Sequence, residues 1–562
     1  MSMTTSRMRS VVALLVVSAL AGCSGESGTS TSSSTAASTV PPTSTSTTIP
    51  PTSTTSAATT TSSTTTTTLA PRVSGAVDVV ARQAASGPGW FSEALPDLPE
   101  GDLAPEAVFE VGATPVGNRR DGSISPTLVS SYVFLQFGDV GPDDLEEHAG
   151  TLRALFIRSA LLSFVDYPGD RVLDWDGRSI AIPMDVTGMI RKANELDLPV
   201  FLEINYSDFV PGPLGSGVDA LQAADNVANT VLFLRGLQEQ GLRVEGVTFG
   251  DEIGDESGFG SAKPTLENCD LIDRYLAYAV ALKDALPGLK IYAFDSYIAA
   301  TRGQVADYLP LLNTIREAEV RTGRELIDGF VFRESYVYMD EDGRVLDSQS
   351  ILDDIESLAG LEPVWRYDVF GNRHQDPDRG YLVTLTEEIG AMFGRDLDIG
   401  ISEYLPAGPV QISESDTSPY EDIDFLIHYA DLVGTYAEQG LDVVSTWAFA
   451  NETDQAKAYL DRQGNRGLSY AVHEQLARYF RGSILDVRRP VSYSALRVKV
   501  YVAQDGDGYF VVLLNKDAEH EHTIRLVRAG EFDLALRLPA RSYTSVLLNQ
   551  EGILVTGVGP TQ

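Results

Sequence analysis

The sequence predicts an α/β fold: a (β/α)8 TIM barrel with a C-terminal antiparallel β-sandwich domain. The first observation behind this prediction is a regular alternation of eight short, strongly apolar runs with amphipathic segments of helical length. The second is a change of pattern after Gly482, where short alternating strands are joined by turn sequences such as Asp505-Gly506. A chain of 562 residues is long enough for both units.

The eight apolar runs are predicted strands of a parallel sheet, because helices bury both faces of such a sheet and its strands lack polar alternation. Eight strand–helix repeats favour closure into a barrel over an open doubly wound sheet. The predicted strands are Val129–Phe137, Leu155–Val165, Pro199–Tyr206, Val244–Glu252, Leu289–Asp295, Ile327–Tyr338, Leu397–Tyr404 and Leu441–Phe449. The predicted helices are Asp143–Leu155, Met184–Leu196, Asp219–Gln240, Glu267–Leu286, Gln304–Thr322, Tyr381–Gly394, Asp422–Gln439 and Ser469–Arg481.

The barrel is predicted over residues 126–482 and the sandwich over residues 483–562. Residues 72–125 form an N-terminal segment, and its stretch Ala107–Val116 is a candidate further strand of the sandwich. The other predicted sandwich strands are Val491–Ala503, Gly508–Asn515, His522–Val527, Phe532–Leu538 and Tyr543–Asn549.

The composition excludes several classes of protein. With 79 acidic and 42 basic residues the net charge is −37, so the chain lacks the basic surface that nucleic-acid binding requires. Two cysteines cannot form a disulfide-rich scaffold or a four-thiolate zinc site. Among the six histidines only His520 and His522 stand close together, on a strand whose edge we expect to be solvated. We therefore expect no metal and no cofactor.

Residues 1–23 have the layout of a bacterial lipoprotein signal peptide. Arg7 and Arg9 precede an apolar run, Val11–Ala19, that is too short to span a bilayer. The residues that follow, LAGC, resemble a lipobox, so Cys23 is expected to carry acyl chains that anchor the protein to the membrane. An ordinary signal peptide cleaved at small residues is the alternative.

Residues 24–71 are almost entirely Ser, Thr, Ala and Pro, with Glu26 as the one charged residue. Such a segment cannot bury apolar area and is typical of a disordered linker. We expect this linker to hold the folded domains away from the membrane, on its extracytoplasmic side.

The fourth and seventh predicted strands each carry a glutamate at the C-terminal end. The fourth ends in VTFGDE and the seventh in IGISEY, which gives Glu252 and Glu403. Functional groups of a TIM barrel lie at the C-terminal ends of its strands, and strands four and seven stand on opposite sides of the barrel mouth. Two carboxylates that face each other across a cleft are the groups that glycoside hydrolysis requires.

At these positions the chain resembles clan A of the glycoside hydrolases, which are retaining barrel enzymes with an acid/base Glu after strand four and a nucleophile Glu after strand seven. The late strand LPARSYTSVLL resembles the β-sandwich of families thirty-nine, forty-four, fifty-one and seventy-nine. The resemblance implies that Glu252 is the acid/base and Glu403 the nucleophile. It also implies that Trp447 forms the floor of the sugar site and that Tyr336 orients the nucleophile.

One position departs from the clan, because Asp251 stands where an Asn usually contacts the sugar 2-hydroxyl. Asp251 could accept that hydrogen bond, and its charge would favour the protonated form of Glu252 that a general acid needs. Alternatively the acid is Asp255 or Glu256, or catalysis has been lost. Further candidates for contacts with sugar hydroxyls are Arg158, Asn205, Asp295, Tyr297, Arg333 and Tyr404, and Arg158 is also a candidate partner for Glu403.

The resemblance implies an extracytoplasmic glycoside hydrolase that cleaves a polysaccharide or oligosaccharide by a retaining double displacement. Two alternatives stay open. The first is a non-catalytic carbohydrate-binding or cell-wall-attachment lipoprotein on a barrel scaffold. The second is a solute-binding lipoprotein, which would have two open α/β lobes instead of a closed barrel.

Overall fold

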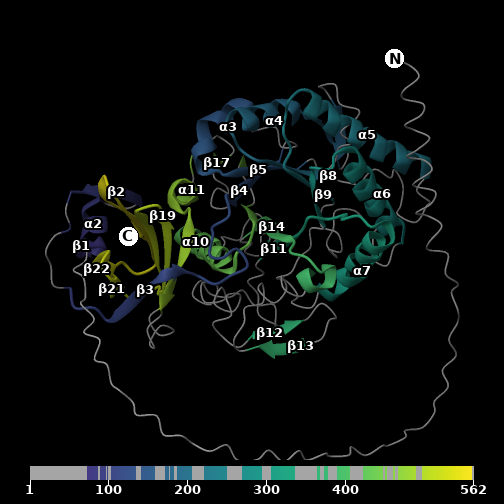
Figure 1. The fold of residues 1–562 in the computed structure, drawn as a ribbon. Helices are drawn as coiled ribbons and strands as arrows, with labels where there is room; N and C mark the ends of the chain where they lie inside the picture. The colour runs from purple at the N-terminus through teal and green to yellow at the C-terminus, as the bar shows by residue number, and fades with distance from the viewer. Residues whose placement is uncertain are drawn as a thin grey trace, which may run out of the picture.

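The part of the chain that the structure describes consists of a barrel and a β-sandwich (Figure 1). The computed structural model describes residues 72–559, except 87–88, 97, 99–102, 135–140, 159–170, 176–177, 183–185, 205–219, 250–268, 294–304, 336–363, 368–372, 377–388, 406–421, 447–449, 452–459, 462–465, 467 and 489–496. The predicted signal peptide with Cys23 and the predicted linker therefore lie outside the described residues.

Eight parallel strands close into a barrel in the order β10-β11-β14-β15-β4-β5-β8-β9. In chain order these strands are β4 (Thr127–Phe134), β5 (Ala154–Arg158), β8 (Val200–Ile204), β9 (Gly246–Phe249), β10 (Lys290–Ala293), β11 (Gly329–Ser335), β14 (Asp398–Leu405) and β15 (Val443–Thr446). Each overlaps one of the eight predicted ranges, so the predicted barrel strands are confirmed.

A helix follows each barrel strand, as the alternating pattern predicts. The helices are α3 (Pro142–His148), α4 (Val186–Glu195), α5 (Ala220–Glu239), α6 (Cys269–Ala285), α7 (Val305–Thr322), residues 389–393, α10 (Asp422–Gln439) and α11 (Leu468–Tyr479), with a short 3-10 turn η2 (Ala149–Thr151) after α3. Figure 1 shows α3 to α7 as an outer arc around the strands. No helix within the described ranges is apolar over a length that would span a bilayer.

Side-chain alternation along the strands separates two cores. Outward-facing residues such as Leu202, Ile291 and Ile399 belong to the large cluster between the strands and the helices. A small inner cluster fills the barrel itself and consists of Ala154, Phe156, Phe201, Tyr292, Val331 and Val443.

Three small two-stranded sheets lie in the segments that follow β5, β11 and β15. They are β6–β7 (Arg171–Trp175, Arg178–Ile182), β12–β13 (Val364–Tyr367, Arg373–Asp376) and β16–β17 (Ala450–Asn451, Leu460–Asp461).

The sandwich is one sheet of ten strands in the order β1-β22-β21-β3-β18-β19-β20-β23-β24-β2. Its strands are β1 (Val73–Asp78), β2 (Gly89–Leu95), β3 (Ala107–Pro115), β18 (Ser483–Arg488), β19 (Val498–Asp505), β20 (Gly508–Asn515), β21 (His522–Arg528), β22 (Phe532–Leu538), β23 (Ser542–Asn549) and β24 (Gly552–Gly559), and helix α2 (Val79–Ser86) follows β1. The sheet is mainly antiparallel, but β1 pairs in parallel with β22 and β3 with β21.

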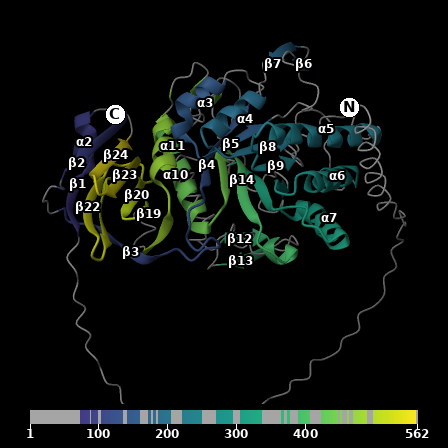
Figure 2. The same cartoon turned by 45° about the horizontal axis from the view of Figure 1, so that its top comes forward.

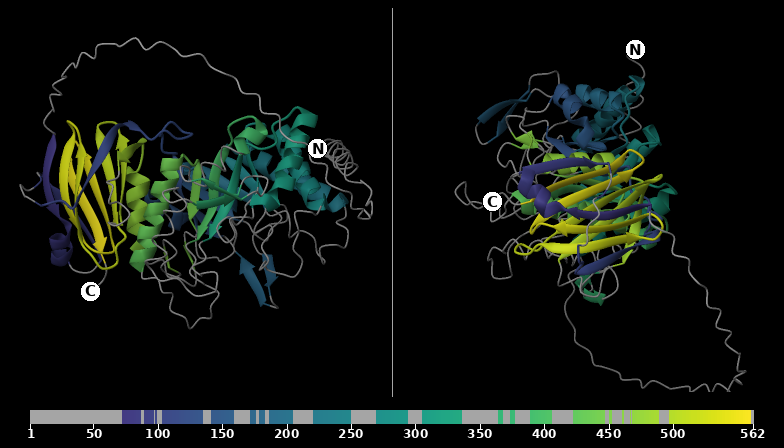
Figure 3. Two further views of the ribbon diagram at one scale, coloured as in Figure 1. Left: turned by 90° about the horizontal axis from the view of Figure 1, so that it is seen from below. Right: turned by 90° about the vertical axis from the view of Figure 1, so that its left-hand side faces the viewer.

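Three sandwich strands thus come from the segment before the barrel, and in Figure 3 these purple strands lie among the yellow C-terminal ones. The two halves of the sheet enclose a separate core, in which Phe109 and Leu526 from one half meet Val511 and Val555 from the other. The barrel is therefore inserted between strands of a single sandwich.

Helix α10 joins the barrel to the sandwich, and Figure 2 shows it between the two. The Tyr501 hydroxyl of β19 donates to the main-chain oxygen of Asp431 on α10 at 2.9 Å. Lys516 Nζ lies 3.0 Å from Asp431 Oδ2, and both side chains are buried. Gly434 on α10 makes room for Tyr501, because a Cβ there would lie 2.4 Å from the tyrosine ring.

We predict that Lys516→Met lowers the free energy of unfolding by about 3–5 kcal/mol, because it leaves the buried Asp431 carboxylate without its cation. The matched control is Arg243→Met, which removes a cation from the exposed Arg243–Asp197 pair and should cost less than about 1 kcal/mol. Urea unfolding of both variants measures the difference. Equal losses would contradict the role of the interface pair.

Candidate active site

Of the two candidate catalytic carboxylates, Glu403 lies on a described strand, and Glu252 comes after one in the sequence. Glu403 is two residues from the end of β14, the seventh strand, and Glu252 follows β9, the fourth, by three residues. The backbones of Arg158, Arg333, Glu403 and Tyr404 are described, but their side chains are not. Asn205, Asp251, Glu252, Asp255, Glu256, Asp295, Tyr297, Tyr336 and Trp447 all lie outside the described residues, beyond the C-terminal ends of their strands.

A β-bulge interrupts β14 immediately before Glu403. On one edge of the strand Phe332 pairs with Ile401, and the next pair is Arg333 with Glu403. On the other edge the register also gains a residue on β14 between Ile401 and Tyr404. Because both edges show the irregularity, the extra residue belongs to β14 itself. Bulges of this kind occur near active sites, where they redirect a side chain.

The bulge changes which side of the sheet position 403 occupies in the register. Ile399 and Ile401 belong to the outer cluster, so regular alternation would give position 403 the outer side as well. With the bulge, position 403 pairs with Arg333, which is two residues after Val331 of the inner cluster. The backbone register therefore assigns position 403 to the inner side of the barrel.

An aromatic floor fills the lower part of the barrel. The rings of Phe156 and Phe201 stack with centroids 4.7 Å apart, and Tyr292 meets Phe201 edge-on at 5.8 Å. Gly246 and Gly329 flank Tyr292, and a Cβ at either glycine would lie under 3 Å from its ring. Burial and the neighbouring Asp398 charge raise the pKa of Tyr292 well above its ordinary value, so the phenol stays neutral.

Glu203 and Thr248 form the next layer above this floor. Both are buried, and both follow an inner-side residue by two positions, Phe201 on β8 and Gly246 on β9. Glu203 pairs in register with Arg158 on one side and with Thr248 on the other. Glu203 was not predicted as a site residue, although it is the one charged residue in the apolar run VFLEI.

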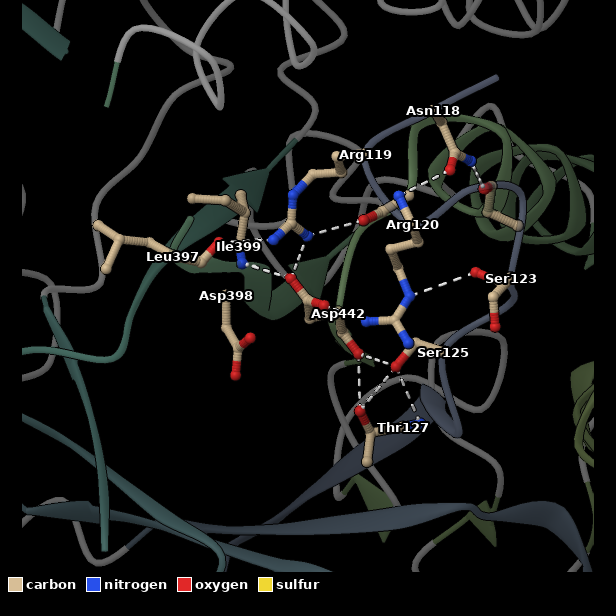
Figure 4. A network of polar contacts seen from close by, with 12 residues as sticks. Asn118, Arg119, Arg120, Ser123, Ser125, Thr127, Leu397, Asp398, Ile399 and Asp442 are labelled. Carbon is tan, nitrogen blue, oxygen red and sulfur yellow. Dashed lines mark hydrogen bonds and ion pairs between the residues drawn. The ribbon is translucent and has the colours of Figure 1, made fainter. Parts of the chain in front are cut away.

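The opposite end of the barrel is held by a polar network around Asp442 (Figure 4). The Asp442 carboxylate forms ion pairs with Arg119 and Arg120 and accepts a hydrogen bond of 2.7 Å from the Ile399 amide at the start of β14. Arg119 also donates to the carbonyl oxygens of Leu397 and Gly440 at 2.6 and 2.9 Å. Thr127, at the start of β4, donates to the Asp442 carbonyl at 2.6 Å. The network fixes the lower ends of β14, β15 and β4.

The described residues include no group of three or more His, Cys, Asp or Glu side chains placed to hold a metal ion. His520 and His522 do not form one. His522 Nδ1 lies 2.9 Å from Glu106 Oε2, and His520 Nδ1 lies 3.1 Å from Asp517 Oδ1. Partial burial acts to raise the pKa of Asp517, but hydrogen bonds from the Glu519 and His520 amides and from both histidine side chains outweigh it and lower that pKa.

This architecture has counterparts among solved structures. The chain has the fold of clan A glycoside hydrolases. A family 51 α-L-arabinofuranosidase from Bifidobacterium longum matches with a TM-score of 0.52 and 13% identity, over 81% of this chain and 100% of its own. A family 44 endoglucanase from Clostridium thermocellum matches with a TM-score of 0.51 and 12% identity, over 80% of this chain and 99% of its own.

An α-L-arabinofuranosidase from Thermotoga maritima matches equally well, with a TM-score of 0.51, 12% identity, and coverage of 80% of this chain and 99% of its own. In contrast to these structural matches, no protein-family model and no curated protein sequence matches the chain. At 10–13% identity the likeness establishes the shared fold of barrel and sandwich.

We predict that Asp442→Asn lowers the free energy of unfolding by about 3 kcal/mol or more, because one amide cannot replace a carboxylate that two guanidinium groups share. The control is Asp284→Asn, whose carboxylate pairs with Arg324 at the surface and should contribute less than about 1 kcal/mol. The unfolding midpoints of both variants in urea test this. A loss for Asp442→Asn no larger than the loss for Asp284→Asn would contradict it.

Proposed function

We propose that this protein is a retaining glycoside hydrolase that acts on a polysaccharide or oligosaccharide. The observation that carries the proposal is the placement of two carboxylates on a closed parallel barrel, one after the fourth strand and one near the end of the seventh. Glycoside hydrolysis with retention uses two carboxyl groups about 5 Å apart, one as acid/base and one as nucleophile. The likeness in fold to an arabinofuranosidase and an endoglucanase supports this chemistry.

The strand register supports the pairing of Glu252 with Glu403. A continuous ladder aligns Thr248 on β9 with Tyr292 on β10 and Gly329 on β11. Arg333, the register partner of Glu403, is four residues beyond Gly329, and Glu252 is four residues beyond Thr248. In the sequence, Glu252 and the register partner of Glu403 are thus the same number of residues beyond one hydrogen-bonded row.

In the proposed reaction Glu403 attacks the anomeric carbon while Glu252 gives its proton to the leaving oxygen. Glu252 then removes a proton from the water that releases the sugar from Glu403. The bulge gives position 403 the inner side of the barrel in the backbone register, in line with position 333, and we propose that the charge of Arg333 favours the ionised form of Glu403. Asp251 and Trp447 are proposed to contact the bound sugar, Asp251 through the 2-hydroxyl.

Of the two alternatives, the solute-binding lipoprotein is not favoured, because the eight strands close on themselves instead of forming two open lobes. A non-catalytic carbohydrate-binding protein on the same scaffold is distinguished from the enzyme by activity alone. We further propose that the protein is an extracytoplasmic lipoprotein, on the basis of the apolar run and LAGC sequence before Cys23.

We predict that the protein releases sugar from a polysaccharide panel and that its first-formed product keeps the anomeric configuration, as nuclear magnetic resonance would show. Glu403→Gln should lower kcat by roughly 10⁴-fold or more, and Glu252→Gln by about 10²–10⁴-fold. The control is Glu325→Gln at an exposed carboxylate, which should leave kcat unchanged. Full activity of Glu403→Gln would refute the assignment.

We predict that Cys23→Ser moves the protein from the membrane fraction to the soluble fraction of expressing bacteria, because it removes the site of acylation. Metabolic labelling with a fatty acid should mark the wild-type protein and not the variant. Unchanged membrane association without label would contradict lipidation.

A further inference from the structure

Glu203 is a carboxylate in an environment that does not favour charge. It is 1% exposed, and its neighbours on β8 are Val200, Phe201, Leu202 and Ile204. Leu202 and Ile204 belong to the outer cluster and Phe201 to the inner one, so alternation places Glu203 inside the barrel. Burial of an uncompensated carboxylate costs several kcal/mol, so a barrel that keeps Glu203 requires a positive partner for it.

The register identifies the cation closest to Glu203 along the sheet. Arg158 on β5 is its Cα partner, and Arg158 is two residues after Phe156 of the inner cluster. Residues in register on adjacent strands share one face of the sheet, with Cβ atoms about 4.5–5.5 Å apart. The other register partner, Thr248, carries no charge. Lys290 and Asp398 lie at the opposite end of the barrel, where they pair with each other at 2.9 Å.

Glu403, the other partner that the sequence allows for Arg158, has a register partner of its own. Glu403 pairs with Arg333, from the adjacent strand β11. The barrel wall therefore carries two Arg–Glu register pairs, one on strands two and three and one on strands six and seven. Glu252 follows β9, which is adjacent to the first of these pairs.

We propose that Glu203 is a positioning residue of the active site, whose buried carboxylate binds the Arg158 guanidinium and neutralises it next to the strand that carries the general acid. The catalytic consequence rests on the function proposed above, whereas the ion pair does not. Without Glu203, the positive charge of Arg158 would favour the ionised form of Glu252 and so remove the proton that the reaction requires.

The activity test compares pH profiles of kcat/KM on the polysaccharide that the wild-type protein hydrolyses. Glu203→Gln should move the basic limb of the profile down by about one pH unit and lower kcat near neutral pH about tenfold, with KM nearly unchanged. Thr248→Val changes a buried residue in the same row and should leave the basic limb at its wild-type pH. Glu203→Asp keeps the negative charge and should likewise give a basic limb near the wild-type pH. A Glu203→Gln profile that coincides with the wild-type profile, or an equal shift in Thr248→Val, would overturn the proposal.

The ion pair is tested separately by a double-mutant cycle in urea unfolding, with Glu203→Gln, Arg158→Gln and the double variant. The double variant should lose clearly less stability than the two single losses added together. Additive losses would overturn the pair even in an active enzyme. The cycle could instead show coupling between Glu203 and Arg158 in a protein that hydrolyses no polysaccharide. In that case the proposed function has failed and the ion pair is structural, which also overturns the positioning role.

Discussion

The Asp442 carboxylate is the interaction on which the arrangement of this molecule depends. It ties Arg119 and Arg120, from the segment that leaves the sandwich, to the Ile399 amide at the start of the strand that carries Glu403. The adjoining carbonyl accepts from Thr127, at the first barrel strand, across the seam where the last strand meets the first. One residue thus closes the barrel, attaches the sandwich and fixes the strand of the proposed nucleophile.

The barrel consequently divides along its axis into a part for stability and a part for chemistry. Asp442 fixes its lower end, and the aromatic floor of Phe156, Phe201 and Tyr292 fills the space above it. The buried polar side chains of Glu203 and Thr248 form the layer above the floor. This division is general in TIM barrels, in which the C-terminal ends of the strands carry function. It allows loops at the mouth to vary without loss of the scaffold.

Much of this architecture could be predicted from local sequence, because the barrel strands are short, strongly apolar runs and Glu252 and Glu403 stand where such runs end. What could not be predicted depends on register between distant segments. The bulge that reassigns position 403 exists only relative to β11 and β15. Likewise the glycines beside Tyr292 come from β9 and β11, so their fit to that ring is invisible along the chain. Glu203 was overlooked because a single charge within a strand gains meaning only from the strand beside it.

The parallel pairing of β1 with β22 bears on how the chain can fold during its synthesis. Val73 on β1 pairs with Phe532 on β22, so β1 cannot form this ladder until β22 has been synthesised, late in translation. The barrel strands, by contrast, pair mostly with neighbours in sequence, and closing such short loops is entropically cheaper. The barrel is therefore expected to form first and to bring β1–β3 close to β18–β24, so that the sandwich assembles last.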